Sequence, residues 1–386
     1  MNYWPRRRAM YMWREYDLAE VRDEMAHIAD MGFEVVRLFL LTRDFLPEPA
    51  RVDGTMVGRL VDVCRVASEE GLRVVPTLMV LNMSGRIWWP DWMCDAGGRP
   101  GDLYRDPVLL GAQTLLAETS AGALAGSGAI RAIDLANEID DAQRPRTRED
   151  GAAWAARLAA GVRRGAPGVP VQVGAHLPSL STTNHMRVDD LAAVADEDMM
   201  HAYPLYSDVA RSFLDPELVP FSCVLTSELA ASGRRTLMQE FGLCTAPRGS
   251  VGMTITDDFL GTPRAQYLAS EEEGAQYYEA VLERLVRTGA AGAYAWCYAD
   301  YDSRLYDRPP FATAVRERTF GLVRPDGSEK PAVAVFRALR TRRDAGLLDA
   351  AGPRTPLLDV SADEYYANPV RHFARLYSAW LAGLPS

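Results

Sequence analysis

Two glutamates lie at the ends of apolar runs in similar local sequence, and a pair of carboxylates suits acid–base and nucleophilic chemistry. Glu138 and Glu240 each follow a polar amide residue at the end of a short apolar run, in "IDLANE" and "TLMQE". A carboxylate there is costly to desolvate unless it pairs with another group or takes part in a reaction. Two carboxylates facing one cleft can cleave a glycosidic bond: one protonates the leaving oxygen, and the other attacks or stabilises the anomeric carbon. The alternative is a structural ion pair, for example with Arg37 or Arg235.

The elements that must position these glutamates alternate along the chain. Short apolar runs are continuous rather than strictly alternating, which is typical of parallel strands covered on both faces. They span 34–41, 72–81, 130–139, 169–176, 198–206, 235–243 and 291–301, and the opening "MNYWP" supplies an eighth. Amphipathic helical patterns lie between them, at 17–32, 57–71, 149–168 and 271–290, and a last one follows at 330–346.

This alternation predicts an α/β protein with a closed (β/α)8 TIM barrel. An open doubly wound sheet would commonly carry a Gly-rich phosphate turn, and the sequence has neither GxGxxG nor GxxxxGK. We expect the barrel to span residues 1–346. Residues 347–386 form a short C-terminal helical extension that packs on the barrel or at a subunit interface.

Barrel chemistry gathers where the strands end at their carboxyl side. The fourth and seventh strands lie across the barrel mouth from one another, so Glu138 and Glu240 can point into one central cleft. The other polar and aromatic residues at predicted strand ends are Arg37, Asn82, Asn137, His176, His201, Tyr203 and Trp296.

The order of these motifs resembles the clan of retaining (β/α)8 glycoside hydrolases that contains family 5. Its marks are an Asn-Glu pair ending strand four and a Glu ending strand seven, present as "ANE" and "QEFG". An Arg in "VVRLF", a His-x-Tyr in "HAYP" and a Trp in "AYAWCY" follow the same order. The opening "NYWPRRRAMYMW" and the late "FGLVRPDGSEKPA" look like the β-mannosidase and mannanase branch. The resemblance covers roughly residues 1–340.

The resemblance implies that Glu138 is the general acid/base and Glu240 the nucleophile. The acid must be protonated near neutral pH, so its pKa should be raised, whereas that of the nucleophile should stay low. Retention of configuration follows, with the two carboxyl groups about 5–5.5 Å apart.

The same resemblance gives roles to the surrounding residues. Asn137 would hold the sugar 2-hydroxyl and Tyr203 would donate a hydrogen bond to Glu240. Arg37 would add positive charge beneath the nucleophile, and it is suited to this because it does not lose its proton. Trp296 would be the platform for the sugar bound to the enzyme.

One position departs from the family pattern. Many members of the clan have a histidine near the end of strand three, where this chain has Asn82, and this leaves the identity of the sugar open. His176, at the end of strand five, either occupies neighbouring space or serves as a turn partner. Asp140, which follows Glu138 by two residues, is interpreted as a loop charge.

Two loops can contribute to substrate binding. The segment 86–95, "RIWWPDWMCD", offers Trp89 or Trp92 to stack on a sugar, or forms a hydrophobic plug or subunit contact. The loop 297–321 is long and polar, and its charges at 300–304 either bind hydroxyls or form a solvated cluster. Two long loops over the mouth of the barrel favour a pocket with walls over an open groove. Such a pocket favours cleavage at the end of a sugar chain, that is, exo action.

These features predict an exo-acting, retaining β-mannosidase that acts on manno-oligosaccharides. The alternatives are an endo-β-1,4-mannanase, a β-glucanase or β-glucosidase, or a barrel that binds sugar without cleaving it. A metal-dependent barrel hydrolase would require an HxH pair on strand one, which here reads "NYW". We therefore expect no metal and no cofactor.

The composition of the chain limits the classes of molecule that it is expected to bind. The formal net charge is −10, which disfavours nucleic acid and anionic membranes as partners. No apolar run approaches the roughly 20 residues of a membrane span, and the N-terminus lacks the apolar core of a signal peptide. Five scattered cysteines without a CxxC indicate reduced thiols. The prediction is a cytoplasmic protein with a small carbohydrate partner, and a homo-oligomer is left open.

Overall fold

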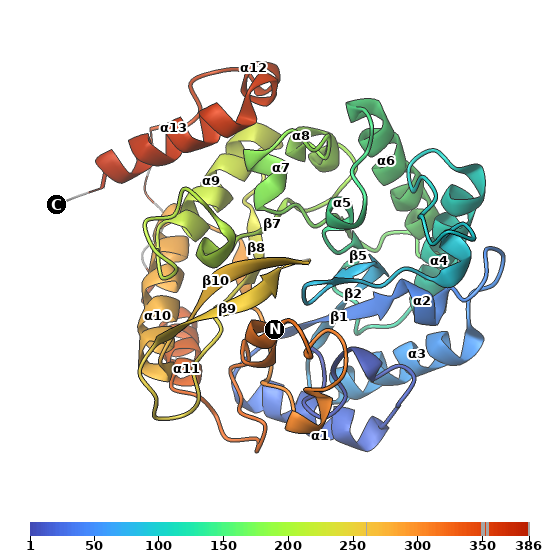
Figure 1. The fold of residues 1–386 in the computed structure, drawn as a ribbon, viewed down its shortest axis with the longest axis horizontal. Coiled ribbons are helices and arrows are strands. Elements are labelled where there is room, and N and C mark those ends of the chain that lie inside the picture. Colours follow the sequence, from blue (N-terminus) through green and yellow to red (C-terminus); the bar gives the residue numbers. More distant parts are fainter. Residues whose placement is uncertain (260, 349–351, 353–354, 385–386) are drawn as a thin grey trace.

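The chain forms a ring of parallel strands surrounded by helices (Figure 1). The computed structural model describes residues 1–259, 261–348, 352 and 355–384. The strands of the ring are β1 (Val35–Leu41), β2 (Arg73–Val80), β5 (Ile133–Ala136), β6 (Val171–Gln172), β7 (Met199–His201), β8 (Leu237–Phe241) and β11 (Gly292–Ala295). They pair in parallel in the orders β1-β2-β5-β6 and β11-β8-β7.

Two short contacts join these sheets into a closed ring. A bridge between His176 and His201 connects the end of β6 with β7. On the other side, Asn2 forms a bridge with Arg37 of β1, and its backbone N–H donates to the carbonyl of Ala295 in β11 at 3.1 Å. The opening segment thus fills the eighth place, as predicted. The predicted (β/α)8 class is confirmed by the structural comparisons reported below.

Long helices cover the outside of the ring. They are α1 (Leu18–Asp30), α3 (Gly54–Glu69), α4 (Pro107–Leu124), α6 (Arg148–Gly165), α9 (Leu218–Ala230), α10 (Glu271–Thr288) and α11 (Ala332–Asp344). Short helices lie in the loops, namely α2 (Thr42–Phe45), α5 (Ile139–Ala142), α7 (Leu177–Ser181) and α8 (Val188–Ala192). Several long helices begin at a residue that caps free backbone N–H groups: Asp17, Asp53 and Asp106 do so alone, and Thr147 and Ser270 form capping boxes. None of the described helices is long and apolar enough to cross a bilayer.

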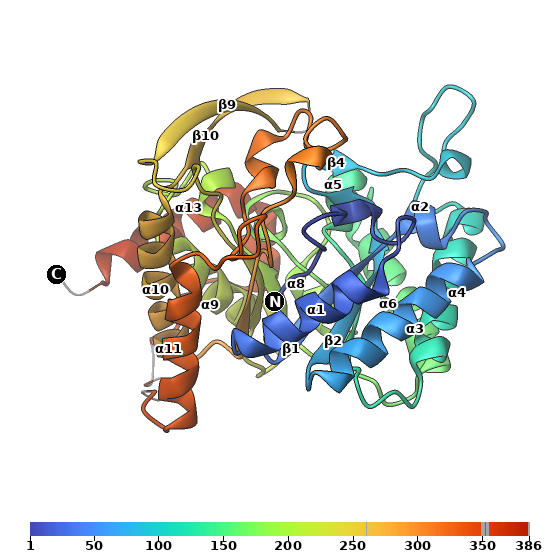
Figure 2. The same ribbon diagram turned by 90° about the horizontal axis from the view of Figure 1, so that it is seen from below.

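An antiparallel hairpin crosses the mouth of the barrel (Figures 1 and 2). It consists of β9 (Met253–Phe259) and β10 (Thr262–Leu268), which no pattern in the sequence predicts. Asp257 anchors the hairpin to the loop after β11: it accepts from the backbone N–H groups of Val315 and Arg316 at 2.7 and 2.9 Å, and from the Arg316 guanidinium at 3.0 Å. A smaller hairpin, β3 (Asn82–Met83) and β4 (Arg86–Ile87), follows β2.

The C-terminal segment packs on the barrel through α12 (Ala362–Ala367) and α13 (Pro369–Ala382). Phe221 of α9 is buried against three aromatic rings of α13: Phe373, Tyr377 and Trp380, at centroid distances of 5.3, 4.9 and 6.0 Å. Tyr365 of α12 donates from its hydroxyl to the carbonyl of Leu180 in α7 at 2.7 Å. The segment is therefore joined to the helices that follow strands β6 and β7.

We predict that Phe221→Ala destabilises the fold by about 3–5 kcal/mol, because it leaves a cavity under α13. Denaturant unfolding measures this loss. Val108→Ala on α4, where the side chain is 56% exposed, is the matched control and should change the free energy of unfolding by less than about 0.5 kcal/mol. Equal effects of the two variants would contradict the docking of α13 on α9.

Candidate active site

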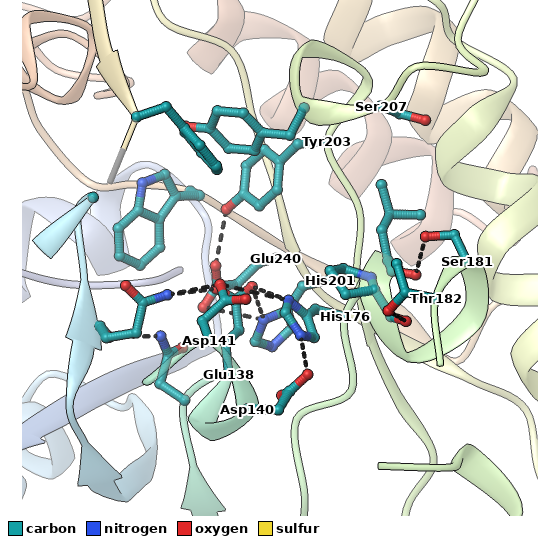
Figure 3. Close-up of a pocket in the computed structure, with 18 of the residues that line it drawn as sticks. Glu138, Asp140, Asp141, His176, Ser181, Thr182, His201, Tyr203, Ser207 and Glu240 are labelled. Atoms are coloured by element: carbon teal, nitrogen blue, oxygen red, sulfur yellow. Dashed lines mark hydrogen bonds and ion pairs between the residues drawn. The ribbon is translucent and has the colours of Figure 1, made fainter. Parts of the chain in front are cut away.

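Glu138 and Glu240 face one cavity at the carboxyl end of the barrel strands (Figure 3). Glu138 follows β5 with its backbone in the left-handed region (φ 41°), which turns the chain into α5, and Glu240 belongs to β8. One carboxylate oxygen of each lies within 4.8 Å of the other. The cavity has a volume of about 670 Å³. Its walls include the predicted residues Asn82, Asn137, His176, His201, Tyr203 and Trp296.

The carboxylate of Glu240 is held by two donors. Arg37 lies fully buried beneath it and donates to Oε1, and the hydroxyl of Tyr203 donates to Oε2 at 2.9 Å. Arg37 also donates to Asp134 at 2.8 Å and to the side-chain oxygen of Asn137 at 3.1 Å. Burial and the neighbouring Glu240 raise the pKa of Tyr203 well above its ordinary value, so this hydroxyl remains a donor. The orientation of Glu240 is therefore fixed at both oxygens.

Glu138 lies among cationic and polar groups. Its Oε1 is 2.9 Å from Nδ1 of His201 and 3.7 Å from Nδ1 of His176, and its Oε2 accepts from Asn82 at 3.3 Å. Burial alone would raise the pKa of Glu138, but His176, His201 and Arg37 outweigh it and lower the pKa to about 2. The expectation of a raised pKa is thus wrong for the free protein, because the two imidazoles compete for the proton.

A chain of buried amides fixes the tautomer of His201. Glu197, paired with Arg131 at 2.6 Å, can only accept, so the amide nitrogen of Gln172 must donate to it. The Gln172 oxygen then accepts from the Gln239 amide nitrogen at 3.0 Å, and the Gln239 oxygen accepts from Nε2–H of His201 at 2.8 Å. Nδ1 of His201 therefore faces Glu138, and the two groups share one proton.

His176 and the residues after Glu138 form a second charged group, and here a prediction fails. Asp140 is not a loop charge: it is buried, 2.8 Å from Nε2 of His176, and accepts from Asn184 at 2.7 Å. Burial would lower the pKa of His176, but Asp140, Asp141 and Glu138 raise it to about 10. Burial and the charge of Glu138 raise the pKa of Asp141 to about 7, despite the opposing effect of His176.

The aromatic segment after strand three does not reach the cavity. Trp92 donates from its indole N–H to the carbonyl of Leu46 at 2.8 Å, and Trp89 packs against the hydrophobic core. Neither tryptophan is among the described residues that line the cavity, and both pack against the hydrophobic core. In the loop after β11, Asp300 is buried and pairs with Lys330 at 2.7 Å, away from the cavity.

Other residues of the cavity were not anticipated from the sequence. Tyr206 accepts from Nε of Arg316 at 3.0 Å and donates to Glu317 at 3.1 Å, and Phe259 of the hairpin packs on its ring at 5.1 Å between centroids. Asp141, described above, is another. The only signal was the density of charge in "AVRERTF", which does not reveal that Arg316 and Glu317 turn inward.

Two groups of potential metal ligands occur among the described residues, and both contain Glu138. They are Glu138 with Asp141 and His176, and Glu138 with His201 and Glu240, in each case with the ligand atoms within 4.8 Å of one another. The imidazole nitrogens in both groups already pair with carboxylates, and the raised pKa of each histidine favours the protonated ring, which cannot bind a metal. The residues fit a metal poorly.

Comparisons with solved structures place this fold among sugar-cleaving enzymes, although no family model and no curated protein matches the chain. GH5_18 from Streptomyces cattleya, solved with GlcNAc, is 23% identical over 98% of this chain and 90% of that chain, with a TM-score of 0.81. Another structure of GH5_18 from that organism contains Manβ1-4GlcNAc. An exo-β-1,4-mannosidase from Opitutaceae bacterium strain TAV5 is 26% identical over 90% of this chain and 60% of that chain, with a TM-score of 0.75.

The chain has the fold of these glycoside hydrolases of the family 5 type, and Glu138 and Glu240 face one cavity within it. The similarity to GH5_18 proteins and to an exo-β-1,4-mannosidase confirms the predicted resemblance to the mannosidase branch of that clan.

We predict that Gln239→Leu lowers the pKa of the His201 imidazole, because its buried Nε2–H loses the acceptor that stabilises the cation. In the native protein this pKa is raised: burial opposes the shift, but Glu240 and Glu138 outweigh it. The titration can be followed by NMR with labelled histidine, of which the chain has five.

Gln172→Leu should have the same effect in smaller measure, since it leaves Gln239 free to turn. An unchanged His201 titration in both folded variants would show that the amide chain does not control this proton.

Proposed function

We propose that this protein is a retaining, exo-acting β-mannosidase with Glu138 as acid/base and Glu240 as nucleophile. The observation that carries the proposal is the pair of carboxylates that face one cavity with oxygens within 4.8 Å. Retaining glycosidases have carboxyl groups about 5–5.5 Å apart, whereas inverting enzymes need about 6.5–9.5 Å to admit a water. The short separation supports direct attack by Glu240.

In the first step, Glu240 attacks the anomeric carbon while the glycosidic C–O bond breaks. The Glu138–His201 pair delivers its shared proton to the leaving oxygen, which departs as an alcohol and leaves carboxylate and neutral imidazole behind. Tyr203 and Arg37 hold Glu240 so that one oxygen points to the sugar. The product of this step is a glycosyl ester on Glu240.

In the second step, water takes the place of the leaving group. The Glu138–His201 pair accepts a proton from this water as its oxygen bonds to the anomeric carbon, and the ester bond to Glu240 breaks. Both groups return to their starting protonation. Two displacements at one carbon give a product with the configuration of the substrate.

A β-linked mannose as the sugar and cleavage at a chain end are supported by two further observations. First, one structural neighbour is an exo-β-1,4-mannosidase, and another was solved with Manβ1-4GlcNAc bound. The hairpin β9–β10 crosses the barrel mouth, and its Phe259 lines the cavity together with Arg316 and Glu317. A wall over one side favours a terminal sugar over an internal one. An endo-β-mannanase, a β-glucanase or a β-glucosidase of the same clan is the competing assignment.

The experiment that tests this function measures kcat/KM on a panel of aryl β-glycosides that differ in the sugar. Manβ1-4GlcNAc is the first disaccharide to be assayed beside them. We expect aryl β-mannoside to be the best aryl substrate by at least about 10-fold in kcat/KM, and the β-anomer of mannose to be the first product seen by NMR. Equal rates on aryl β-glucoside or β-galactoside would refute the mannose assignment. An α-anomer as first product would refute retention.

The two glutamates should respond differently to substitution. Glu240→Gln should lower kcat by about 10⁴-fold or more. Glu138→Ala should cleave activated aryl mannosides slowly and be rescued by azide with formation of β-mannosyl azide, because the anion needs no general base. Mass spectrometry after a 2-deoxy-2-fluoro mannosyl fluoride should find the label on Glu240. Labelling of a residue other than Glu240 would exclude Glu240 as the nucleophile. Azide rescue of Glu240→Gln but not of Glu138→Ala would contradict the assignment of Glu138 as acid/base.

A further inference from the structure

A second cavity lies at the opposite end of the barrel from Glu138 and Glu240. It is lined by residues at the amino ends of β5, β8 and β11, by the turn between α1 and β1, and by α10 and α11. In Figure 2 these two helices stand side by side, and the hairpin β9–β10 covers the other end of the barrel. The volume of this cavity is about 610 Å³, and none of its described lining residues also lines the active-site cavity.

The part of this cavity that lies along α10 and α11 is apolar. Phe33, which follows α1, and Phe336 of α11 pack with their ring centroids 5.1 Å apart. Both rings line the cavity and are only half-buried, and the same holds for Val286 of α10 and Leu339 of α11. Apolar side chains that three helical segments leave partly open to one cavity favour a ligand with an apolar body.

Arginines line the same cavity and outnumber the carboxylates that pair with them. The four arginines are Arg131, Arg235, Arg340 and Arg343. The described carboxylates in ion pairs with them are Glu34, Glu197 and Asp344. Arg235 is exposed and forms no ion pair or hydrogen bond with the described part of the chain. One positive charge therefore remains for a ligand.

A buried donor without an acceptor lies where the cavity meets the barrel interior. Tyr294 of β11 lines the cavity, is 6% exposed and packs with Met199 and Leu237. Its hydroxyl has no hydrogen-bond partner among the described residues. Burial raises the pKa of Tyr294 to about 12, so the hydroxyl keeps its hydrogen near neutral pH. Because an unpaired buried donor is costly, this end of the cavity favours a ligand with acceptor oxygens.

Arg131 lies at the same end of the cavity and has further N–H groups to donate. Its positive charge lowers the pKa of Tyr294 against the effect of burial, so the guanidinium is near that hydroxyl. A guanidinium has five N–H groups, and Arg131 directs two of its nitrogens to Glu197, at 2.5 and 2.6 Å. Together with Arg235, it can hold an anion between two guanidinium groups.

We propose that this cavity binds a carboxylate with an aliphatic chain, that is, a fatty acid. Arg235 and Arg131 hold the carboxylate at the amino end of the barrel, next to Tyr294, and the chain lies along α10 and α11 against Val286 and Phe336. The surplus of one positive charge matches a monoanion. The site shares no residue with the catalytic machinery, so this inference does not depend on the proposed function.

The test measures binding of octanoate by calorimetry, with three compounds that each lack one part of it. We expect one octanoate per chain. The neutral 1-octanol and the cationic octyltrimethylammonium should bind at least about 10-fold more weakly, because neither pairs with an arginine. Acetate, which lacks the chain, should bind at least about 100-fold more weakly. Octanoate that does not saturate the protein, or that binds no better than 1-octanol, would overturn the proposal.

Two variants locate the bound octanoate. Arg235→Gln should weaken its binding by about 10-fold, because one charged donor is lost, and should leave 1-octanol within about twofold. Val286→Glu should weaken octanoate by at least about 10-fold, because it adds a like charge to the apolar wall. Arg287→Gln is the matched control: it removes the same charge from an exposed neighbour that is not among the described lining residues, and it should change octanoate binding by less than about twofold.

The pattern across these variants decides the inference. Equal weakening by Arg235→Gln and Arg287→Gln would show that octanoate responds to net charge alone, and native affinity in both Arg235→Gln and Val286→Glu would place it elsewhere on the protein. Either result refutes the site. Neither result bears on the mannosidase assignment, because Arg235, Val286 and Arg287 are not among the described residues that line the active-site cavity.

Discussion

The buried guanidinium of Arg37 is the interaction on which the rest of this structure depends. It donates to Glu240, Asp134 and Asn137 and to the side chain of Asn2, so one cation connects β1, β5, β8 and the opening segment. A buried charge of this kind is tolerated only when its donors are satisfied, and removing one partner leaves the others uncompensated. The closure of the barrel and the placement of Glu240 are therefore two results of the contacts that one side chain makes.

The electrostatics of Glu138 differ from the simplest expectation for a general acid, whose pKa is raised. Two imidazoles lie beside Glu138, and their positive charge outweighs the effect of burial on its pKa. A proton between these groups is consequently held by Glu138 and His201 together. His176 is kept cationic by Asp140 and Asp141 and supplies much of the field that both groups experience.

The sequence predicted the parts of the fold that depend on burial of apolar surface. Continuous apolar runs located the strands, and the two glutamates stood out because they end such runs. The hairpin β9–β10 was missed because only three residues of its two strands are buried and two of these, Asp257 and Gln266, are polar, so no buried apolar face marks it. Asp140 was misread for the opposite reason: only the folded loop shows that it turns inward to His176. The segment after strand three was predicted to offer Trp89 or Trp92 to a sugar. Both tryptophans pack against the hydrophobic core instead.

The amide chain behind His201 has a further consequence. Gln172 and Gln239 could satisfy each other in two orientations, since an amide turned by half a revolution exchanges its donor for its acceptor. Glu197 permits one orientation only, because a carboxylate cannot donate. Arg131, which keeps this carboxylate in place, is about one-third exposed at the far rim of the barrel. Which nitrogen of His201 carries the proton that Gln239 accepts is thus decided by the ion pair of Arg131 and Glu197, and a substitution of Arg131 changes the state of His201 without altering any residue that lines the cavity.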